Sequence, residues 1–252
     1  MMAGVGSSPR PYVVIGNPPR VSDLYMPEHL AKTRGLSDPD PDSDVVRVSF
    51  GQACSASVDG LLLLHSYDIR ATTSLLAKQG DNKVRQLTGL ADPDRLPGMA
   101  HFVFNPVTGQ LFRLPAIQGP KPKKSLVGFN LGILTHTKAD AGRGPPDRYA
   151  VAELDGNADV MLRFLSETGD WDLVKCSPCP LPAAERRMVI SQEVVPFKGH
   201  MWWVDLTWGA ICADPFRDRP EPRFIELPSG SVLPAEAEAI RPRSLLPDAD
   251  HY

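Results

Sequence analysis

The sequence offers one closely spaced pair of residues that could do chemistry, the thiols of Cys176 and Cys179. A structural zinc site needs four ligands, and the two remaining cysteines, Cys54 and Cys212, are isolated in the sequence. A redox pair needs a helix N-terminus that lowers the pKa of one thiol, whereas a proline-rich segment follows this pair. We therefore expect two ordinary thiols in a turn at a strand end, with no metal ion and no cofactor.

The histidines form no second candidate site, because none has the spacing of metal ligands; they lie at positions 29, 65, 101, 136, 200 and 251. His101 and His200 each open an expected hairpin, which favours a repeated strand-start position over a catalytic pair. The chain has no Gly-x-Ser-x-Gly sequence and no nucleotide-binding glycine motif, so neither a hydrolase triad nor a phosphate loop is indicated. The sequence thus assigns no catalytic, cofactor-binding or metal-binding residue.

The charge of the chain is small, since 27 basic and 30 acidic residues leave a net charge of −3. No field of this size attracts nucleic acid or an anionic membrane surface. A basic run at 121–124 is expected to be a surface loop, with a nuclear-import signal as the alternative. The first 20 residues hold no signal-peptide core, and the apolar run 61–64 is far shorter than the roughly 20 residues that span a bilayer. With only four cysteines, these features predict a cytoplasmic or nuclear protein that binds neither nucleic acid nor membrane.

The elements that must position any site are short strands. The chain has 26 prolines and 20 glycines among its 252 residues, and proline lacks the backbone donor that helix interiors and central strands need. Apolar patterning predicts strands at 11–15, 45–50, 61–67, 125–135, 148–154 and 187–197, while only 235–240 has helical character. We expect an all-β chain with a disordered tail over 1–10, a single domain over 11–234, and a C-terminal tail with a short helix over 235–252.

The most informative pattern is a hairpin unit of strand, turn and strand that recurs at 101–115, 161–174 and 201–227. The expected turn glycines, Gly109, Gly169 and Gly209, lie 60 and 40 residues apart. This spacing suits propeller repeats of roughly 40–50 residues with loops of unequal length. Short antiparallel strands at this density are typical of a sandwich, a barrel or a propeller, and the recurring hairpins favour a propeller.

Parts of these hairpins resemble plant protein families. The segments 58–64 (VDGLLLL) and 102–115 (FVFNPVTGQLFRLP) are similar to the opening of F-box-associated, kelch-related propellers. The segments 162–169 (LRFLSETG) and 202–210 (WWVDLTWGA), with Asp-Pro-Phe at 214–216, resemble a grass-expanded plant family, the domain of unknown function 1618. The resemblance spans roughly residues 45–235. It implies a kelch-like β-propeller and a plant origin, and it brings no catalytic residues.

Two departures from these families bear on function. No F-box-like helical module precedes the β region, so the resemblance does not support a ligase-adaptor role. The chain ends soon after Pro228, where family members continue with more strands. We therefore expect an incomplete propeller, which leaves a sheet edge and its apolar face uncovered and open to self-association.

The sequence predicts a non-catalytic protein-interaction scaffold that presents loops, such as 78–99 and 138–147, to an unidentified protein partner. The alternative is an enzyme whose site is assembled from propeller strand ends without any linear motif. The two classes differ in what they place at the surface. Convergent carboxylates or histidines favour the enzyme, and an exposed apolar or aromatic patch favours the binding module.

The tryptophans of the third hairpin give the most specific structural expectation. Because side chains alternate along a strand, Trp202, Val204 and Leu206 share one face, and Met201, Trp203 and Asp205 share the other. The face that is entirely apolar should be the buried one. A carboxylate must reach solvent or find hydrogen-bond donors. We therefore expect Trp202 in the core, Trp203 partly buried near a strand end, and Asp205 hydrogen-bonded to a nearby turn.

Overall fold

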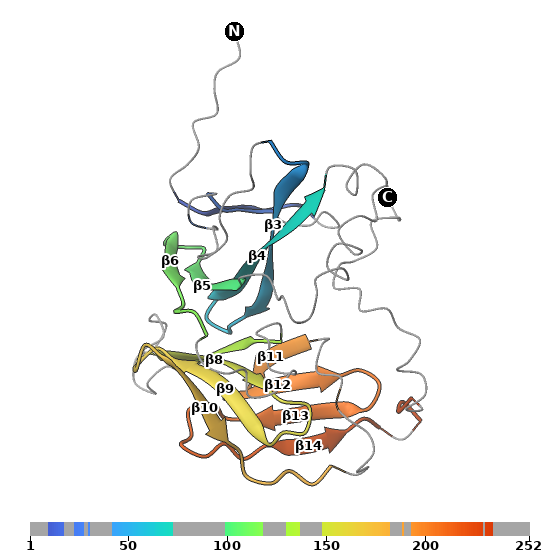
Figure 1. Cartoon of the computed structure of the whole chain (residues 1–252). Coiled ribbons are helices and arrows are strands. Elements are labelled where there is room, and N and C mark those ends of the chain that lie inside the picture. The colour runs from blue at the N-terminus through green and yellow to red at the C-terminus, as the bar shows by residue number, and fades with distance from the viewer. Residues whose placement is uncertain are drawn as a thin grey trace.

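A computed structural model of the chain describes residues 10–17, 23–27, 30, 42–72, 99–117, 130–136, 148–181, 188, 193–228 and 230–233. Within these ranges the regular elements are fourteen β-strands, which form three four-stranded antiparallel sheets and one two-stranded ribbon (Figure 1). The expected all-β fold class is therefore confirmed. The predicted tail up to residue 9, the helix at 235–240, the basic run at 121–124 and nearly all of the loops 78–99 and 138–147 lie outside the described residues.

Each four-stranded sheet is a meander whose strands are hydrogen-bonded in chain order. The first sheet contains β3 (Val45–Ala56), β4 (Leu62–Thr72), β5 (Met99–Asn105) and β6 (Gln110–Arg113). The second contains β7 (Gly132–His136), β8 (Arg148–Leu154), β9 (Val160–Leu165) and β10 (Trp171–Lys175). The third contains β11 (Glu193–Phe197), β12 (His200–Asp205), β13 (Gly209–Ala213) and β14 (Arg223–Glu226). The ribbon pairs β1 (Tyr12–Val14) with β2 (Asp23–Tyr25).

Local turn chemistry explains the outer hairpins. The side-chain oxygen of Asn105 accepts hydrogen bonds from the amides of Val107 and Thr108, which closes the turn between β5 and β6. Gly109 and Gly169 then adopt φ values of +69° and +77°, which residues with a Cβ rarely adopt. Both turn glycines were predicted from the sequence.

The third expected turn glycine was assigned wrongly. Gly209 is the first residue of β13, and its φ is not positive. A Cβ at this position would lie 2.5 Å from the carbonyl oxygen of Ile225 and 2.7 Å from the ring of Phe224. The glycine therefore serves the close approach of β13 to its neighbour β14.

The first strands of the three sheets, β3, β7 and β11, lie against one another. A register shift between Ala53 and Ser55 of β3 marks a β-bulge, a feature that redirects side chains. The hydroxyl of Ser55 donates to the carbonyl of Val194 in β11 at 3.0 Å and accepts from the amide of Ile133 in β7 at 3.4 Å. A single buried side chain thus joins all three sheets.

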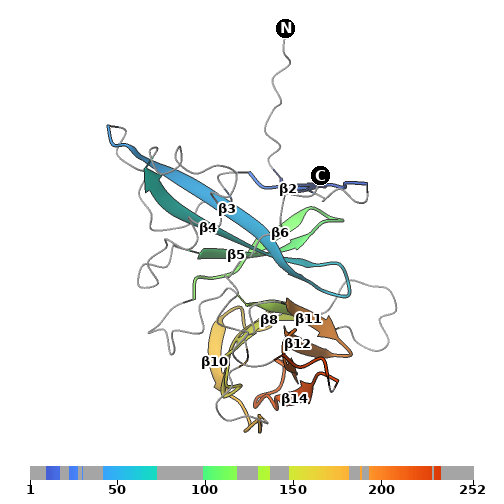
Figure 2. The same ribbon diagram turned by 90° about the vertical axis from the view of Figure 1, so that its right-hand side faces the viewer.

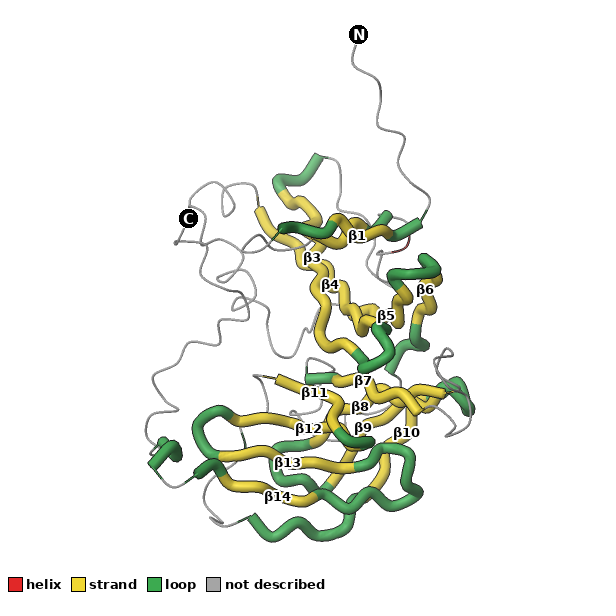
Figure 3. The backbone as a smooth tube through the Cα atoms, turned by 180° about the vertical axis from the view of Figure 1, so that it is seen from behind, coloured by secondary structure: helices red, strands yellow, loops and turns green. Residues whose placement is uncertain are grey.

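The core consists of the layers between sheets. Buried side chains of the first and second sheets form one cluster, which includes Leu63, Val103, Ile133 and Phe164. A second cluster lies between the second and third sheets, and a third cluster lies between the first sheet and the β1–β2 ribbon. Figures 2 and 3 show the resulting order of ribbon, first sheet, and the two remaining sheets.

The second and third sheets approach very closely at Gly132 in β7. A Cβ at this position would lie 2.4 Å from Cγ1 of Val194 and 2.9 Å from the sulfur of Met201. Real Cβ contacts at such distances do not occur, so any side chain at 132 would force the sheets apart. The glycine therefore sets the spacing of this core layer.

Candidate functional site

The structure places the cysteine pair chosen from the sequence in the packing of the second and third sheets. Cys176 is buried and Cys179 is half-buried, and both contribute to one core cluster. Burial raises the pKa of the Cys176 thiol to about 12, and the carboxylates of Asp155 and Asp159 add to the rise. Burial also raises the pKa of the Cys179 thiol. Both groups are therefore neutral thiols at physiological pH, a poor state for metal ligation or redox exchange.

Metal ligation has no other candidate in the described part of the chain, where no three His, Cys, Asp or Glu side chains are placed to hold one ion. The expectation that purified protein carries no stoichiometric zinc stays a prediction.

One nucleophile–base pair appears that the sequence did not indicate. The sulfur of Cys54 lies 2.9 Å from Nδ1 of His65, on adjacent strands of the first sheet. Burial raises the pKa of the Cys54 thiol to about 12, and burial together with the nearby His101 lowers the pKa of His65 to about 4. In an activated Cys–His pair the pKa values shift in the opposite sense, which favours the thiolate and the imidazolium. The pair, formed by buried His65 and half-buried Cys54, is therefore a neutral hydrogen bond beside a core cluster.

The surface feature that stands out is the outer face of the third sheet, the face turned away from the second sheet. The strand register places one apolar row on this face, formed by Val195, Phe197, Trp202, Val204, Ala210 and Ile225. Phe197 is 52% exposed and Ile225 is 43% exposed. Trp202, Val204 and Ala210 are half-buried. We call these six residues the outer apolar face.

The two faces of β12 were assigned the wrong way round from the sequence. Met201, Trp203 and Asp205 are fully buried against the second sheet, whereas Trp202 is half-buried on the outer apolar face. Leu206, expected beside Trp202 in the core, is exposed.

The physical reason for this reversal lies in the turn after β12. One carboxylate oxygen of Asp205 accepts hydrogen bonds from the amide and the hydroxyl of Thr207. These donors replace water, so the carboxylate can be buried together with the tryptophan two residues before it. The predicted bond of Asp205 to a nearby turn is thus confirmed, and that bond is what permits the burial.

The aromatic side chains of the outer apolar face are held in fixed positions. The indole nitrogen of Trp202 donates to the carbonyl of Phe197 at 3.1 Å. The two rings meet edge to face, with centroids 6.1 Å apart. The ammonium of Lys198 lies 5.3 Å from the centroid of the Phe197 ring, within cation–π range. Side chains ordered before contact lose less entropy when a partner binds them.

The turn that carries Lys198 has an unusual backbone. Lys198 and Gly199 have φ values of +48° and +72°, as the two-residue turns that suit β-hairpins require. Asn, Asp or Gly occupies the first of these positions at less cost than lysine. The positive φ that holds the Lys198 ammonium beside Phe197 therefore costs conformational energy. Residues in such unfavourable backbone conformations cluster at functional sites.

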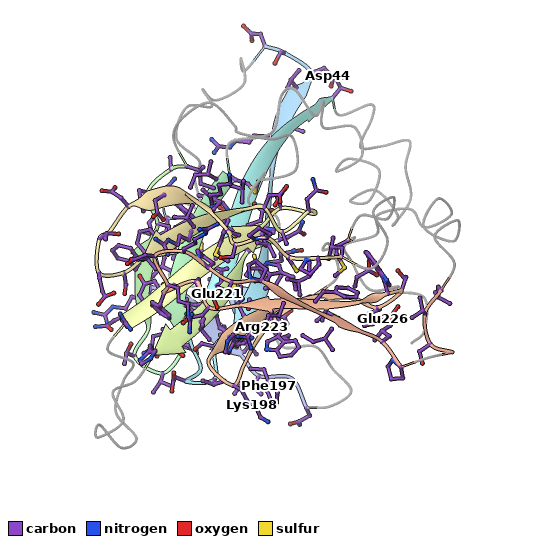
Figure 4. The ribbon with its side chains drawn as sticks, turned by 90° about the horizontal axis from the view of Figure 1, so that it is seen from below. Asp44, Phe197, Lys198, Glu221, Arg223 and Glu226 are labelled. Carbon is purple, nitrogen blue, oxygen red and sulfur yellow. The ribbon has the colours of Figure 1, made fainter. Side chains whose placement is uncertain are left out.

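Charge is distributed unevenly along the outer apolar face. Figure 4 shows Phe197, Lys198 and Arg223 toward one end of the third sheet and Glu226 toward the other. Lys198, Arg223 and Glu226 are all exposed. By the strand register Arg223 shares the outer face with Ile225, whereas Glu226 alternates to the opposite face of β14. The outer apolar face therefore has a basic end at the β11–β12 turn.

Comparisons with known proteins add no further assignment: a scan against protein-family models and searches of curated proteins and of solved structures each find no match. The likeness to plant propeller families therefore stays a prediction from the sequence. No helix in the described ranges is long and apolar enough to cross a membrane.

Proposed function

We propose that this chain is a non-catalytic protein-interaction scaffold whose contact surface is the outer apolar face. The observation that carries the proposal is a contiguous row of apolar side chains on a regular sheet, with Phe197 and Ile225 about half exposed. Contiguous apolar patches at a protein surface mark interaction sites more often than isolated apolar side chains do. The contact surface is thus a sheet face, whereas the sequence pointed to loops.

The scaffold that supports this face is proposed to be a kelch-like or F-box-associated-like propeller fragment. Three successive four-stranded meanders, each with its first strand at the centre, agree with propeller blades in topology. Blades bury both faces of a sheet against their neighbours. The outer apolar face then corresponds to the side of the last described blade on which the next element would pack.

An enzymatic role finds less support. In the Cys54–His65 pair, burial shifts the pKa of each group away from the charged form that nucleophilic catalysis uses. An exposed apolar face with fixed aromatic rings favours the binding class over the catalytic class.

The proposal is tested by a photo-reactive amino acid placed at position 225 and, as a matched control, at position 173. Ile225 and Leu173 are similarly exposed, at 43% and 45%, but Leu173 lies on β10 of the second sheet. After irradiation in an extract of the native cells, position 225 should give discrete covalent protein adducts that position 173 does not give. Equal adduct formation at both positions, or none at position 225, would contradict the proposal.

A further inference from the structure

We infer that the contact between the first and second sheets is a pH-sensitive switch, in which protonation of His65 and His101 separates these two sheets while the second and third sheets stay packed. Separation would expose the apolar side chains that the first and second sheets bury against each other. The outer apolar face takes no part in this change, so the inference is independent of the proposed function.

The two histidines lie inside the contact. His65 on β4 and His101 on β5 are directly opposite each other in the first sheet, so their side chains point to the same face. That face also carries Leu63 and Val103, which pack against the second sheet. Only 2% of His65 and 4% of His101 is exposed, and the two rings meet edge to face with centroids 6.4 Å apart. Two imidazoles therefore form part of the layer that joins the sheets.

Two hydrogen bonds cross this contact. The indole nitrogen of Trp171, in the second sheet, donates to the carbonyl of Pro115, which follows β6 of the first sheet, at 2.8 Å. The amide of Ile133, in the second sheet, donates to the hydroxyl of Ser55, in the first sheet, at 3.4 Å. Both bonds break when the sheets separate, so the exchange of these two protons with solvent measures the opening.

The closed contact disfavours a protonated pair. The sulfur of Cys54 lies 2.9 Å from Nδ1 of His65, and burial raises the pKa of this thiol to about 12, so the thiol carries no compensating negative charge. The ring of His101 packs against Trp171, with centroids 6.2 Å apart. A charge on one imidazole disfavours a charge on the other, and burial disfavours both. Burial and the nearby His101 accordingly lower the pKa of His65 to about 4.

Two carboxylates face the contact, and each accepts a hydrogen bond from a group other than the histidines. Glu153 on β8 points toward the first sheet, because it alternates with Val151, and it accepts from the amide of Asn130 at 3.2 Å. Asp59, in the turn between β3 and β4, accepts from the hydroxyl of Thr135 on β7. Movement of either carboxylate to an imidazolium would tighten the contact in acid, which is the opposite of the opening inferred here.

The other titratable groups around the pair are a phenol and two cations. Tyr149 on β8 packs against the same core cluster, and burial raises its pKa to about 12. Arg113 on β6 lies opposite Phe102, with its guanidinium over that ring, on the side of the β1–β2 ribbon. Lys175 is exposed at the far end of β10. Among the described residues of this contact, only the imidazoles have an ordinary pKa between pH 5 and pH 7.

The layer between the second and third sheets has a different composition. Its buried cluster includes Met201, Trp203 and Ile211 and contains no histidine among its described residues. His200, at the start of β12, is half-buried on the opposite face of the third sheet. Acid therefore adds no imidazolium to this layer, and we expect it to stay closed.

The size of the effect follows from the two states of His65. In the open contact this side chain is solvated and has its ordinary pKa of 6.5, whereas in the closed contact its pKa is about 4. Above pH 6.5 neither state binds the proton, and between pH 6.5 and about 4 the open state binds more protons than the closed state. The equilibrium constant for opening should therefore rise about twentyfold as the pH falls from about 7 to about 5.

The test is hydrogen exchange of the full chain, followed by NMR at about pH 7 and about pH 5, with the rates corrected for the pH dependence of the chemical step. The indole proton of Trp171 and the amide proton of Ile133 should exchange about twentyfold faster at the lower pH. The indole proton of Trp203, buried between the second and third sheets, is the internal reference. Its corrected rate should change by less than about threefold.

Three variants assign the effect to the histidines. His65→Gln should reduce the rise in exchange to within about threefold, because glutamine does not titrate. His101→Gln should also reduce it, because His65 then loses the neighbouring charge that lowers its pKa. His136→Gln, the control at the exposed end of β7, should leave the rise unchanged. Either variant of the buried pair is sufficient, so the test stands if one of the two fails to fold.

Three outcomes would overturn the inference. Exchange at Trp171 and Ile133 that stays constant or slows in acid would show that the contact does not open. An equal rise at Trp203 would show that acid loosens the whole molecule and does not act on one contact. A rise that persists in the folded variants of His65 or His101 would assign the proton to another group.

Discussion

Replacing Trp203 with alanine should destabilise the fold far more than the same change at Trp202. Trp203 has no exposed surface and packs between the second and third sheets, in the cluster that contains Met201 and Ile211. Trp202 is half-buried, and its main fixed contact is the hydrogen bond from its indole nitrogen to the carbonyl of Phe197. The two changes thus remove the same side chain from a closed core and from a surface.

The magnitudes follow from these environments. Truncation of a buried tryptophan to alanine costs about 3–5 kcal/mol in the free energy of unfolding. At Trp202, the lost hydrogen bond and partial burial together should cost roughly 1–2 kcal/mol. For a protein of this size, each kcal/mol lowers Tm by about 2–4 °C, so Trp203→Ala should lower Tm by about 6–20 °C and Trp202→Ala by about 2–8 °C.

Urea and thermal unfolding, followed by circular dichroism, measure both losses. A third variant separates the packing of Trp203 from its polar atom, because its indole nitrogen has no hydrogen-bond partner among the described residues. Trp203→Phe removes this unpaired donor and keeps most of the apolar volume, so it should cost less than half as much as Trp203→Ala. If Trp202→Ala lowers the stability more than Trp203→Ala does, the two faces of β12 have been assigned wrongly here as well.

Three further predictions concern the core layers and the exposed turn. Gly132→Ala should lower the free energy of unfolding, measured in urea, by about 1–3 kcal/mol, because the new Cβ would displace Val194. As a control, Gly51→Ala should lower it much less, because its Cβ would lie no closer than 3.4 Å to its neighbours. In the unfolded chain His65 is protonated below about pH 6.5, whereas in the folded chain its pKa is lowered to about 4. The free energy of unfolding should therefore fall as the pH drops from 6.5 to about 4, and His65→Gln should flatten this pH dependence. Lys198→Asn should raise Tm slightly, because asparagine accepts the positive φ at this turn position, and a fall in Tm would argue against backbone strain there.

The sequence was informative where structure depends on local chemistry. Apolar patterning placed a strand at 148–154, and β8 has these bounds (Arg148–Leu154). Gly109 and Gly169 were recognised from their turn sequences, and both have a positive φ. These features need only neighbouring residues to specify them.

The remaining features depend on residues distant in the sequence. Gly209 was mistaken for a turn residue because its role is the approach of Ile225 and Phe224, which periodicity does not reveal. The Cys54–His65 bond depends on a bulge in β3, and a shift of one residue changes every partner across a strand pair. The short strand β2 (Asp23–Tyr25) was missed because three residues show no period.

The candidate site was missed for a related reason. The sequence predicted an uncovered apolar face in general terms, but the choice between the two faces of β12 depended on one carboxylate. Asp205 was treated as a group that needs solvent, and its two hydrogen bonds from Thr207 supply what solvent would have supplied. With Asp205 in the core, Trp203 is buried beside it and Trp202 is the partly exposed tryptophan. The contact surface is then the face that carries Trp202.

The outer apolar face should be covered when the protein meets its partner. Carbene footprinting of the chain, first dilute and purified and then in an extract of the native cells, measures this directly at single side chains. We expect labelling of Phe197, Trp202 and Ile225 to fall in the extract, whereas labelling of Leu173 on β10, which is about as exposed as Ile225, should stay unchanged. Unchanged labelling of all three residues, with protection elsewhere on the molecule, would contradict the claim.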